Sequence, residues 1–142
     1  NALVEDVIPF IEDNYAACDN PKCRAIGGLS RGGNWAVYIG FQHPDLFNAI
    51  GAHSTPLFYS ELRRIEDTAG RVSSLGDLPR IYVDVGRKDT EKDKVLEFTA
   101  LLDRLGIFYD FHEFEGRHDE IYWGAHVKDY LRWYSERLVI PN

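Results

Sequence analysis

Positive charge and long hydrophobic runs are scarce in this sequence of 142 residues, and methionine is absent. The 16 lysines and arginines are outnumbered by 23 aspartates and glutamates, which gives a formal net charge of −7. Because this excess of negative charge repels a polyanion, we expect no nucleic acid partner. No apolar run approaches the roughly 20 residues that cross a bilayer, so we expect no membrane partner either.

Cysteine is also scarce, and the two cysteines, Cys18 and Cys23, lie close together in the segment CDNPKC. A metal site would need further ligands at a suitable spacing, and none are visible nearby, so we expect no metal and no other cofactor. One interpretation is a disulfide, which requires α-carbons about 4.4–6.8 Å apart and favours a secreted or periplasmic protein. The other is a pair of free thiols in a cytoplasmic protein.

The sequence does contain an alternation of strand-like and helix-like hydrophobic patterns. We expect strands at 23–28, 47–53, 80–85 and 107–114, and helices at 2–16, 31–42, 91–105 and 121–138. This order predicts a single α/β domain over residues 1–142, with a parallel sheet covered by helices on both faces. The residues expected to face inward on the first and last helices are Val4, Val7, Ile8, Ile11 and Tyr15, and Val127, Tyr130, Leu131, Tyr134 and Leu138.

The segment AIGGLSRGGNWA sets one serine between a strand pattern and an apolar helix pattern. Gly28, Ser30 and Gly32 fit G-x-S-x-G, in which a nucleophilic serine occupies a sharp strand-to-helix turn. Small residues are needed at the two glycine positions because larger ones would collide with the adjoining strand and helix. The backbone N–H of Arg31, at the helix N-terminus, can donate to an oxyanion. An ordinary glycine-rich turn is the alternative, but the strand-and-helix setting favours a nucleophile.

A nucleophilic serine needs a base and an acid that orients it, and in such sheets they follow later strands in the order Ser, Asp or Glu, His. Asp89 lies just past the third strand, in VDVGRKD, whereas its rival Asp84 lies within that strand. His118 follows the fourth strand in FEGRHDEIYW. The other histidines fit less well by position or order: His43, His53, His112 and His126. We therefore predict Ser30 as nucleophile, Asp89 as acid and His118 as base.

Three segments in this order resemble the esterase D family of α/β-hydrolases: HPDLFNAIGAHS, VDVGRKD and GRHDEIYWGAHVKDYL. That family includes feruloyl and acetyl xylan esterases, enterochelin esterases, S-formylglutathione hydrolase and the mycolyltransferases. The resemblance covers nearly the whole chain and implies the α/β-hydrolase fold. It also implies a serine esterase that acts through the triad Ser30, His118 and Asp89 and an acyl-enzyme. The substrates would be feruloyl, acetyl or similar small acyl esters, either free or linked to a polysaccharide.

The chain departs from this family in its extent. The family's domain has roughly eight strands, and this chain supplies only the last four. The strand at Cys23–Gly28, which is central in the family, would be left as an apolar edge, and the loop that gives the second oxyanion N–H would be missing. We therefore expect the working protein to contain an N-terminal half or a second copy of the chain at that edge. The lack of methionine and the helical start favour a piece of a longer or nicked protein.

Several aromatic side chains are candidates for an acyl or aryl pocket, although each also suits a core. The candidate substrate contacts are Trp35, His53, Tyr59 and Trp123, the last matching an aromatic that the family often carries past its histidine. Residues 54–79 lack a long periodic pattern and are expected to form an excursion over the site, with a short amphipathic piece near Tyr59–Ile65. Two alternatives remain open: an acyltransferase with the same triad, and a non-catalytic fragment or assembly module that keeps the fold.

Overall fold

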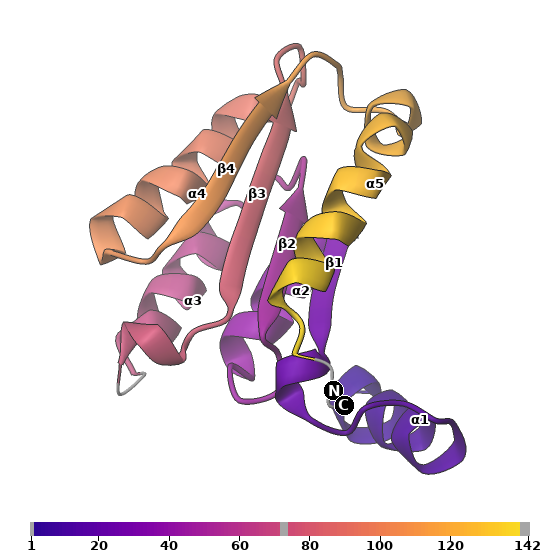
Figure 1. Cartoon of the computed structure of the whole chain (residues 1–142). Helices are drawn as coiled ribbons and strands as arrows, with labels where there is room; N and C mark the ends of the chain where they lie inside the picture. The colour runs from indigo at the N-terminus through magenta and orange to yellow at the C-terminus, as the bar shows by residue number, and fades with distance from the viewer. Residues whose placement is uncertain (1, 72–73, 140–142) are drawn as a thin grey trace.

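A computed structural model describes residues 2–71 and 74–139 and is built around a parallel sheet (Figure 1). The sheet has four strands in the order β1-β2-β3-β4. Their bounds are Ala25–Leu29, Ala49–His53, Arg80–Gly86 and Tyr109–Phe114. All three neighbouring pairs are parallel, and the register sets Leu29 beside His53 and His53 beside Asp84. The segments that follow the strands therefore meet at one edge of the sheet.

Helices cover both faces of this sheet, which confirms the predicted fold class (Figure 1). On one face lie α2 (Arg31–Gln42), α3 (Tyr59–Ala69) and α4 (Lys92–Leu105). On the other lies α5 (Glu120–Arg137). Along the chain, each new strand is added at the same edge of the sheet, next to the strand before it. Since such crossovers are right-handed, successive crossover helices fall on the same face.

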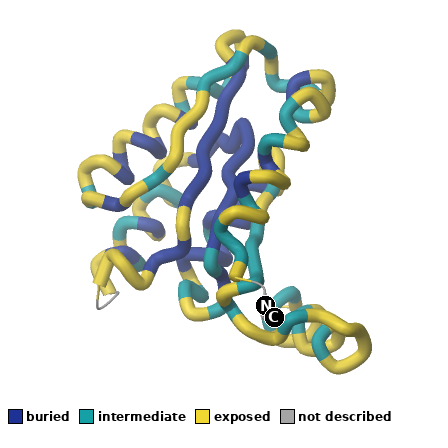
Figure 2. Tube along the Cα trace, in the orientation of Figure 1, coloured by how far each residue is buried: buried dark blue, intermediate teal, exposed yellow. Residues whose placement is uncertain are grey.

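Two hydrophobic clusters hold these layers together, and the central strands are the most deeply buried part of the molecule (Figure 2). The larger cluster lies under α2, α3 and α4 and includes Phe41, Val83 and Phe98. The smaller one lies under α5 and contains Ala49, Tyr82, Tyr130 and Trp133. Gly106 ends α4 in the left-handed conformation, at φ 69°, which is typical of glycine at a helix C-terminus.

The expected excursion at 54–79 is an ordinary crossover between β2 and β3, apart from residues 72–73, which lie outside the described residues. Its helix, α3, is 11 residues long and extends beyond the short piece expected from the sequence. A single 3₁₀ turn, η3 (Leu75–Asp77), precedes β3. The first turn of α3 approaches the serine segment, where Glu61 Oε1 lies 3.6 Å from Arg31 Nη1. The rest of α3 covers the sheet.

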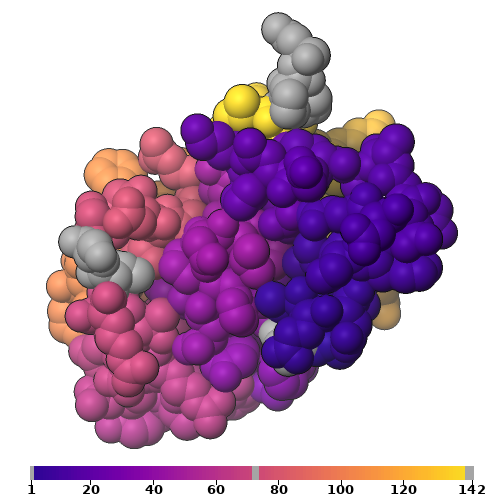
Figure 3. Space-filling model, turned by 90° about the horizontal axis from the view of Figure 1, so that it is seen from below, coloured from indigo at the N-terminus to yellow at the C-terminus, as the bar shows by residue number. Residues whose placement is uncertain are grey.

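The first helix ends at Asn14, two residues before the predicted end at residue 16, and it does not pack as predicted. It consists of a π-helical turn, η1 (Leu3–Val7), and then α1 (Ile8–Asn14), with Pro9 in the first turn of α1. Neither part has a buried residue, and Tyr15, expected to face inward, is 63% exposed. The space-filling view from below shows this segment as an indigo lobe on one side of the molecule (Figure 3).

The apolar face of α5 is also only partly buried. Tyr130 is buried as expected, but Val127 and Leu131 are 45% and 63% exposed. With the free edge of β1 they line an open groove of about 570 Å³, which we call the β1–α5 groove. Within residues 2–71 and 74–139, β1 pairs only with β2, so no described strand fills this groove. The prediction that Val127 and Leu131 face inward is therefore wrong for this chain.

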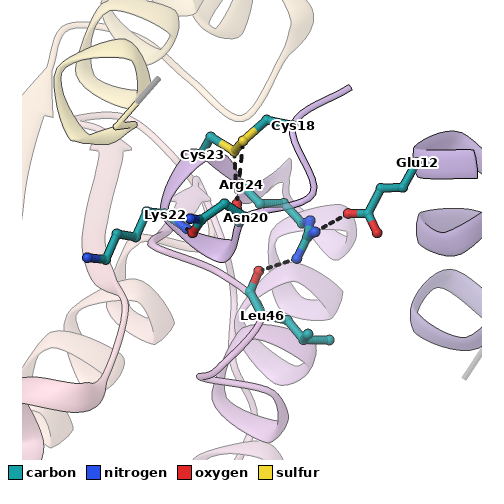
Figure 4. Close-up of a disulfide and its surroundings, with 7 residues drawn as sticks. All are labelled: Glu12, Cys18, Asn20, Lys22, Cys23, Arg24 and Leu46. Carbon is teal, nitrogen blue, oxygen red and sulfur yellow. Dashed lines mark hydrogen bonds and ion pairs between the residues drawn. A yellow bond between two sulfur atoms is a disulfide. The ribbon is translucent and has the colours of Figure 1, made fainter. Parts of the chain in front are cut away.

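A disulfide joins Cys18 to Cys23, with the α-carbons 6.3 Å apart, which confirms the first of the two interpretations (Figure 4). The bond closes the turn between α1 and β1. Next to it, the Arg24 guanidinium pairs with Glu12 on α1 and donates to the carbonyl of Leu46 at 2.8 Å. The disulfide and Arg24 together connect α1 to the start of the sheet. None of the described helices is both long and apolar enough to span a membrane.

Candidate active site

Ser30 lies between the last residue of β1 and the first of α2, with φ 51° and ψ −119°. A non-glycine residue in such a conformation costs about 1–3 kcal/mol and persists only where the surroundings enforce it. Two backbone hydrogen bonds do so here. The Ser30 N–H donates to the carbonyl of His53 at 2.8 Å, and the Ser30 carbonyl accepts from the Asn34 N–H at 3.2 Å. The turn thus holds the serine side chain at the carboxyl edge of the sheet.

Close approach explains two of the glycines around this serine. A Cβ at Gly28 would lie 2.3 Å from the carbonyl carbon of Gly32, and a Cβ at Gly33 would lie 1.8 Å from Thr55 Oγ1. A Cβ at Gly32 would meet nothing within 4 Å. The steric requirement predicted for Gly28 therefore holds, whereas the one predicted for Gly32 applies to Gly33 instead.

The structure brings together the three predicted residues Ser30, His118 and Asp89. His118 Nε2 lies 2.8 Å from Ser30 Oγ, and Nδ1 of the same ring lies 3.0 Å from each carboxylate oxygen of Asp89. An ionised carboxylate can only accept hydrogen bonds, so Nδ1 carries the proton and Nε2 is free to accept from the Ser30 hydroxyl. Asp89 is only 7% exposed, and its Oδ1 also accepts from the Glu91 N–H at 2.8 Å.

An aromatic ring and a backbone N–H at a helix N-terminus lie near these three residues. The Trp123 ring meets the His118 ring edge-on, with the centroids 5.2 Å apart. The N–H of Arg31 belongs to the first turn of α2, where backbone N–H groups have no partner within the helix. No cluster of His, Cys, Asp and Glu that could hold a metal is found in the described part of the chain.

The other predicted substrate contacts are placed less favourably. Trp35 is 59% exposed on α2 and packs edge-on against Tyr38. Tyr59, the first residue of α3, is 77% exposed. His53 is only 3% exposed, and both of its ring nitrogens have hydrogen-bond partners inside the protein. A substrate contact through the His53 side chain therefore does not fit this geometry, because the ring is enclosed between the sheet and α5.

Sequence reasoning missed a buried network around Asp84, the rejected rival for the triad acid. This carboxylate is completely buried, and its Oδ1 lies 2.7 Å from His53 Nδ1. Its Oδ2 accepts from the hydroxyls of Tyr122 at 2.6 Å and Tyr130 at 2.9 Å. The available signal was the expected pairing of the second and third strands, which brings His53 beside Asp84, together with tyrosines spaced along one face of the last helix.

Burial and the nearby Asp84 carboxylate both raise the pKa of Tyr122 and Tyr130 well above the ordinary tyrosine value, burial having the larger effect. The two hydroxyls therefore remain protonated and act as donors to Asp84. The pKa of Tyr134 is raised for the same two reasons. Its hydroxyl lies 2.8 Å from His53 Nε2 and directly over two strand glycines, where a Cβ at Gly27 or Gly51 would come within 1.8 or 1.7 Å of it.

The structure is similar to several solved esterases and hydrolases. An S-formylglutathione hydrolase from Staphylococcus aureus matches with a TM-score of 0.84 and 17% identity, over 92% of this chain and 58% of that one. A ferulic acid esterase matches with a TM-score of 0.83 and 25% identity, over 96% and 60%. The enterobactin esterase of Shigella flexneri matches with a TM-score of 0.79 and 21% identity, over 95% and 37%. The chain thus spans less than two thirds of the length of each.

These structural matches confirm the α/β-hydrolase fold and show that the chain covers only part of it. A family model described as "Putative esterase" matches residues 1–134, which is most of the chain. The resemblance inferred from the three sequence segments is therefore confirmed. The chain belongs to this esterase family.

Proposed function

We propose that this chain carries the catalytic triad of a serine esterase, with Ser30 as nucleophile, His118 as base and Asp89 as the acid that orients it. The observation that carries the proposal is the continuous hydrogen-bonded series from Ser30 Oγ through His118 to Asp89, with distances of 2.8 and 3.0 Å. Membership of the esterase family supports it. We take residues 1–142 as one catalytic unit of the α/β-hydrolase type, which lacks the early strands of the complete fold.

The geometry supports hydrolysis in two steps. Ser30 Oγ attacks the acyl carbon of the ester while His118 Nε2 accepts the serine proton, and the imidazolium then protonates the departing alcohol. Water next attacks the acyl-enzyme while His118 Nε2 accepts its proton, and the imidazolium then returns this proton to Ser30 Oγ as the carboxylic acid leaves. Asp89 holds the imidazole in the required tautomer, and the Arg31 N–H donates to the negative oxygen that forms in each step.

For substrates we propose feruloyl, acetyl or similar small acyl esters, free or attached to a polysaccharide. Solved relatives include proteins named ferulic acid esterase, S-formylglutathione hydrolase and enterobactin esterase. The Trp123 ring beside His118 offers an apolar surface for such an acyl or aryl group. Because a disulfide requires an oxidising compartment during folding, we also propose that the protein is secreted or periplasmic.

The test is covalent labelling with a fluorophosphonate, which reacts with an activated serine. We expect a single adduct on the Ser30 peptide by mass spectrometry and a parallel loss of p-nitrophenyl acetate hydrolysis. Ser60→Ala is a matched control, because Ser60 is an exposed serine on α3, and this variant should be labelled like the wild type. A protein that neither reacts nor hydrolyses the ester would instead be a non-catalytic module. Transfer of the acetyl group to an added alcohol in preference to water would indicate an acyltransferase.

We also propose that the β1–α5 groove is covered in the working protein, preferably by an N-terminal half and otherwise by a second copy of this chain. The free edge of β1 leaves backbone N–H and C=O groups open beside exposed apolar side chains, an arrangement that favours association. Val127 and Leu131 line the groove, and the chain spans 58% to 60% of two solved relatives. An N-terminal half would also bring the second oxyanion donor.

We therefore expect this chain alone, as a monomer, to turn over p-nitrophenyl acetate at least a hundredfold more slowly than a protein that also contains the N-terminal half. The basis is that loss of one oxyanion donor lowers kcat by about 10²–10³-fold. Steady-state kinetics combined with light scattering measures both kcat and mass. Equal kcat values for a monomer of this chain and for the longer protein would refute the proposal. Full activity in a dimer of this chain would identify the second copy as the cover.

A further inference from the structure

Asp84 is a buried carboxylate that is not part of the proposed triad, yet its hydrogen-bond partners His53 and Tyr122 contact the backbone of the segments that carry Ser30 and His118. It lies in β3, five residues before Asp89, and its side chain is completely enclosed. Burying a charged carboxylate is costly unless several donors compensate it. Here the donors are His53 from β2 and Tyr122 and Tyr130 from α5. The network thus joins two strands to the helix that follows His118.

On the nucleophile side, the link runs through His53. Its Nδ1 donates to Asp84 Oδ1 at 2.7 Å, which fixes the last residue of β2. The backbone carbonyl of His53 accepts the Ser30 N–H at 2.8 Å. Because that bond helps to enforce the unusual φ of Ser30, the position of His53 sets the position of the nucleophile. The Ser54 N–H, one residue further on, donates to the backbone carbonyl of Asp84 at 2.9 Å.

On the base side, the link runs through Tyr122. Its hydroxyl donates to Asp84 Oδ2 at 2.6 Å. Its ring packs directly against the backbone of Gly116, two residues before His118, since a Cβ at Gly116 would lie 2.4 Å from Tyr122 Cδ2. The Gly116 carbonyl in turn accepts the Lys88 N–H at 2.9 Å. The loop that carries His118 is therefore held between the Tyr122 ring and the end of β3.

We propose that Asp84, through His53 and Tyr122, is a positioning residue that sets the distance between Ser30 and His118. This inference rests on the proposed esterase function, because positioning matters only if these two groups react. Asp84, His53 and Tyr122 do not touch the reacting atoms. They act through the Ser30 N–H on one side and the Gly116 backbone on the other. A misplacement of reacting groups by about 1 Å can lower a rate a hundredfold, so a small shift in this network has a measurable effect.

The test variant is Tyr122→Phe, which keeps the ring beside Gly116 and removes only the hydroxyl bonded to Asp84. Asp84→Asn is the more direct change, but it removes a buried carboxylate that accepts from three donors and places an NH₂ group among them. That change risks unfolding the protein. For Tyr122→Phe we expect kcat for p-nitrophenyl acetate to fall about ten- to a hundredfold, with KM within about twofold of wild type. We also expect the pH–rate profile of this variant to differ from that of the wild type, because a movement of His118 changes its contact with Asp89.

Tyr109→Phe is the matched control. It removes a tyrosine hydroxyl that donates to another carboxylate, Asp103 Oδ1, at 3.0 Å and on the exposed edge of the sheet. We expect this variant to keep the wild-type kcat and pH profile. A Tyr122→Phe variant that loses thermal stability but keeps both kcat and pH profile would show that the network is only structural and would overturn the proposal.

A second measurement does not depend on turnover. Histidine labelled with ¹⁵N gives NMR signals for the ring nitrogens of His118 in the full chain, and these signals are identified by their loss in His118→Gln. We expect Tyr122→Phe to shift these signals, because a movement of the ring changes the hydrogen bonds that Nδ1 makes with Asp89, and Tyr109→Phe to leave them unchanged. If the wild type neither hydrolyses esters nor reacts with a fluorophosphonate, the proposed function fails. The spectra still decide whether Asp84 and Tyr122 position His118, and unchanged signals in Tyr122→Phe would refute that role.

Discussion

Replacing Ser30 by alanine is expected to lower kcat for p-nitrophenyl acetate by a factor on the order of 10⁶, as for loss of the nucleophile in other serine hydrolases. The reason is that, among the residues the structure describes, only Ser30 Oγ is hydrogen-bonded to the His118 nitrogen that faces away from Asp89. No other described group is placed to form the acyl-enzyme. The fold should survive, because the conformation of residue 30 is enforced by its backbone hydrogen bonds to His53 and Asn34.

Steady-state kinetics checks this expectation, with circular dichroism to confirm folding. The double variant Ser30→Ala with His118→Ala sharpens it, because the members of a triad act as a unit and their losses do not add. We expect the double variant to be no slower than Ser30→Ala within about threefold. A Ser30→Ala protein that retains more than about one per cent of the wild-type rate would rule out Ser30 as the nucleophile.

Replacing Asp89 by asparagine is expected to lower kcat about 10⁴-fold while leaving KM nearly unchanged. An asparagine has the size of aspartate but offers an NH₂ group, which favours the tautomer of His118 with its proton on Nε2. In that tautomer the imidazole cannot accept the proton of Ser30. The remaining oxygen can still accept the Glu91 N–H, which Asp89 Oδ1 accepts at 2.8 Å, so the start of α4 should be preserved.

Asp93→Asn is the matched control for Asp89→Asn. Asp93 is an exposed acid in the first turn of the same helix, and its replacement removes the same charge without touching His118. We expect this variant to keep the wild-type kcat within about twofold, as for most surface changes. A fall of less than tenfold in Asp89→Asn would show that another group orients His118.

The sequence was sufficient to place Ser30, Asp89 and His118 together at one edge of the sheet, because each of them follows a strand with a clear pattern. The helix after Ser30 was placed at 31–42, where α2 is found, because the glycine-rich turn marks its start and His43-Pro44 its end. The helix at α3 was harder to recognise. Only Leu62, Ile65 and Ala69 repeat at helical spacing, among eight other residues that are mostly charged or polar. Such a narrow stripe is a weak signal.

What the sequence could not provide was the identity of the surfaces that cover each apolar face. A helical repeat of apolar residues predicts that one face is protected from water, but not which segment protects it. The face expected to be buried on α1 remains largely exposed in this chain, and the one on α5 is only partly buried. In the same way, the strand pattern placed His53 near the serine. It could not show that its ring lies under α5 beside Asp84 rather than in the substrate site.

The close fit of Tyr134 over Gly27 and Gly51 constrains how this family of sequences can diverge. A methyl group at either glycine would collide with the tyrosine oxygen, and the loss of that oxygen alone would not relieve the collision. The ring carbon Cζ would still lie 2.8 Å from a Cβ at Gly27 and 2.6 Å from one at Gly51. Alanine at position 27 or 51 therefore demands a side chain smaller than phenylalanine at position 134. Alanine at position 51 would also meet His53 Nε2 at 2.7 Å, so that ring would have to move as well. Positions 27, 51 and 134 are far apart in the chain, but they should consequently change together in evolution. A sequence with alanine at either strand position should also have a smaller residue than phenylalanine at the position of Tyr134.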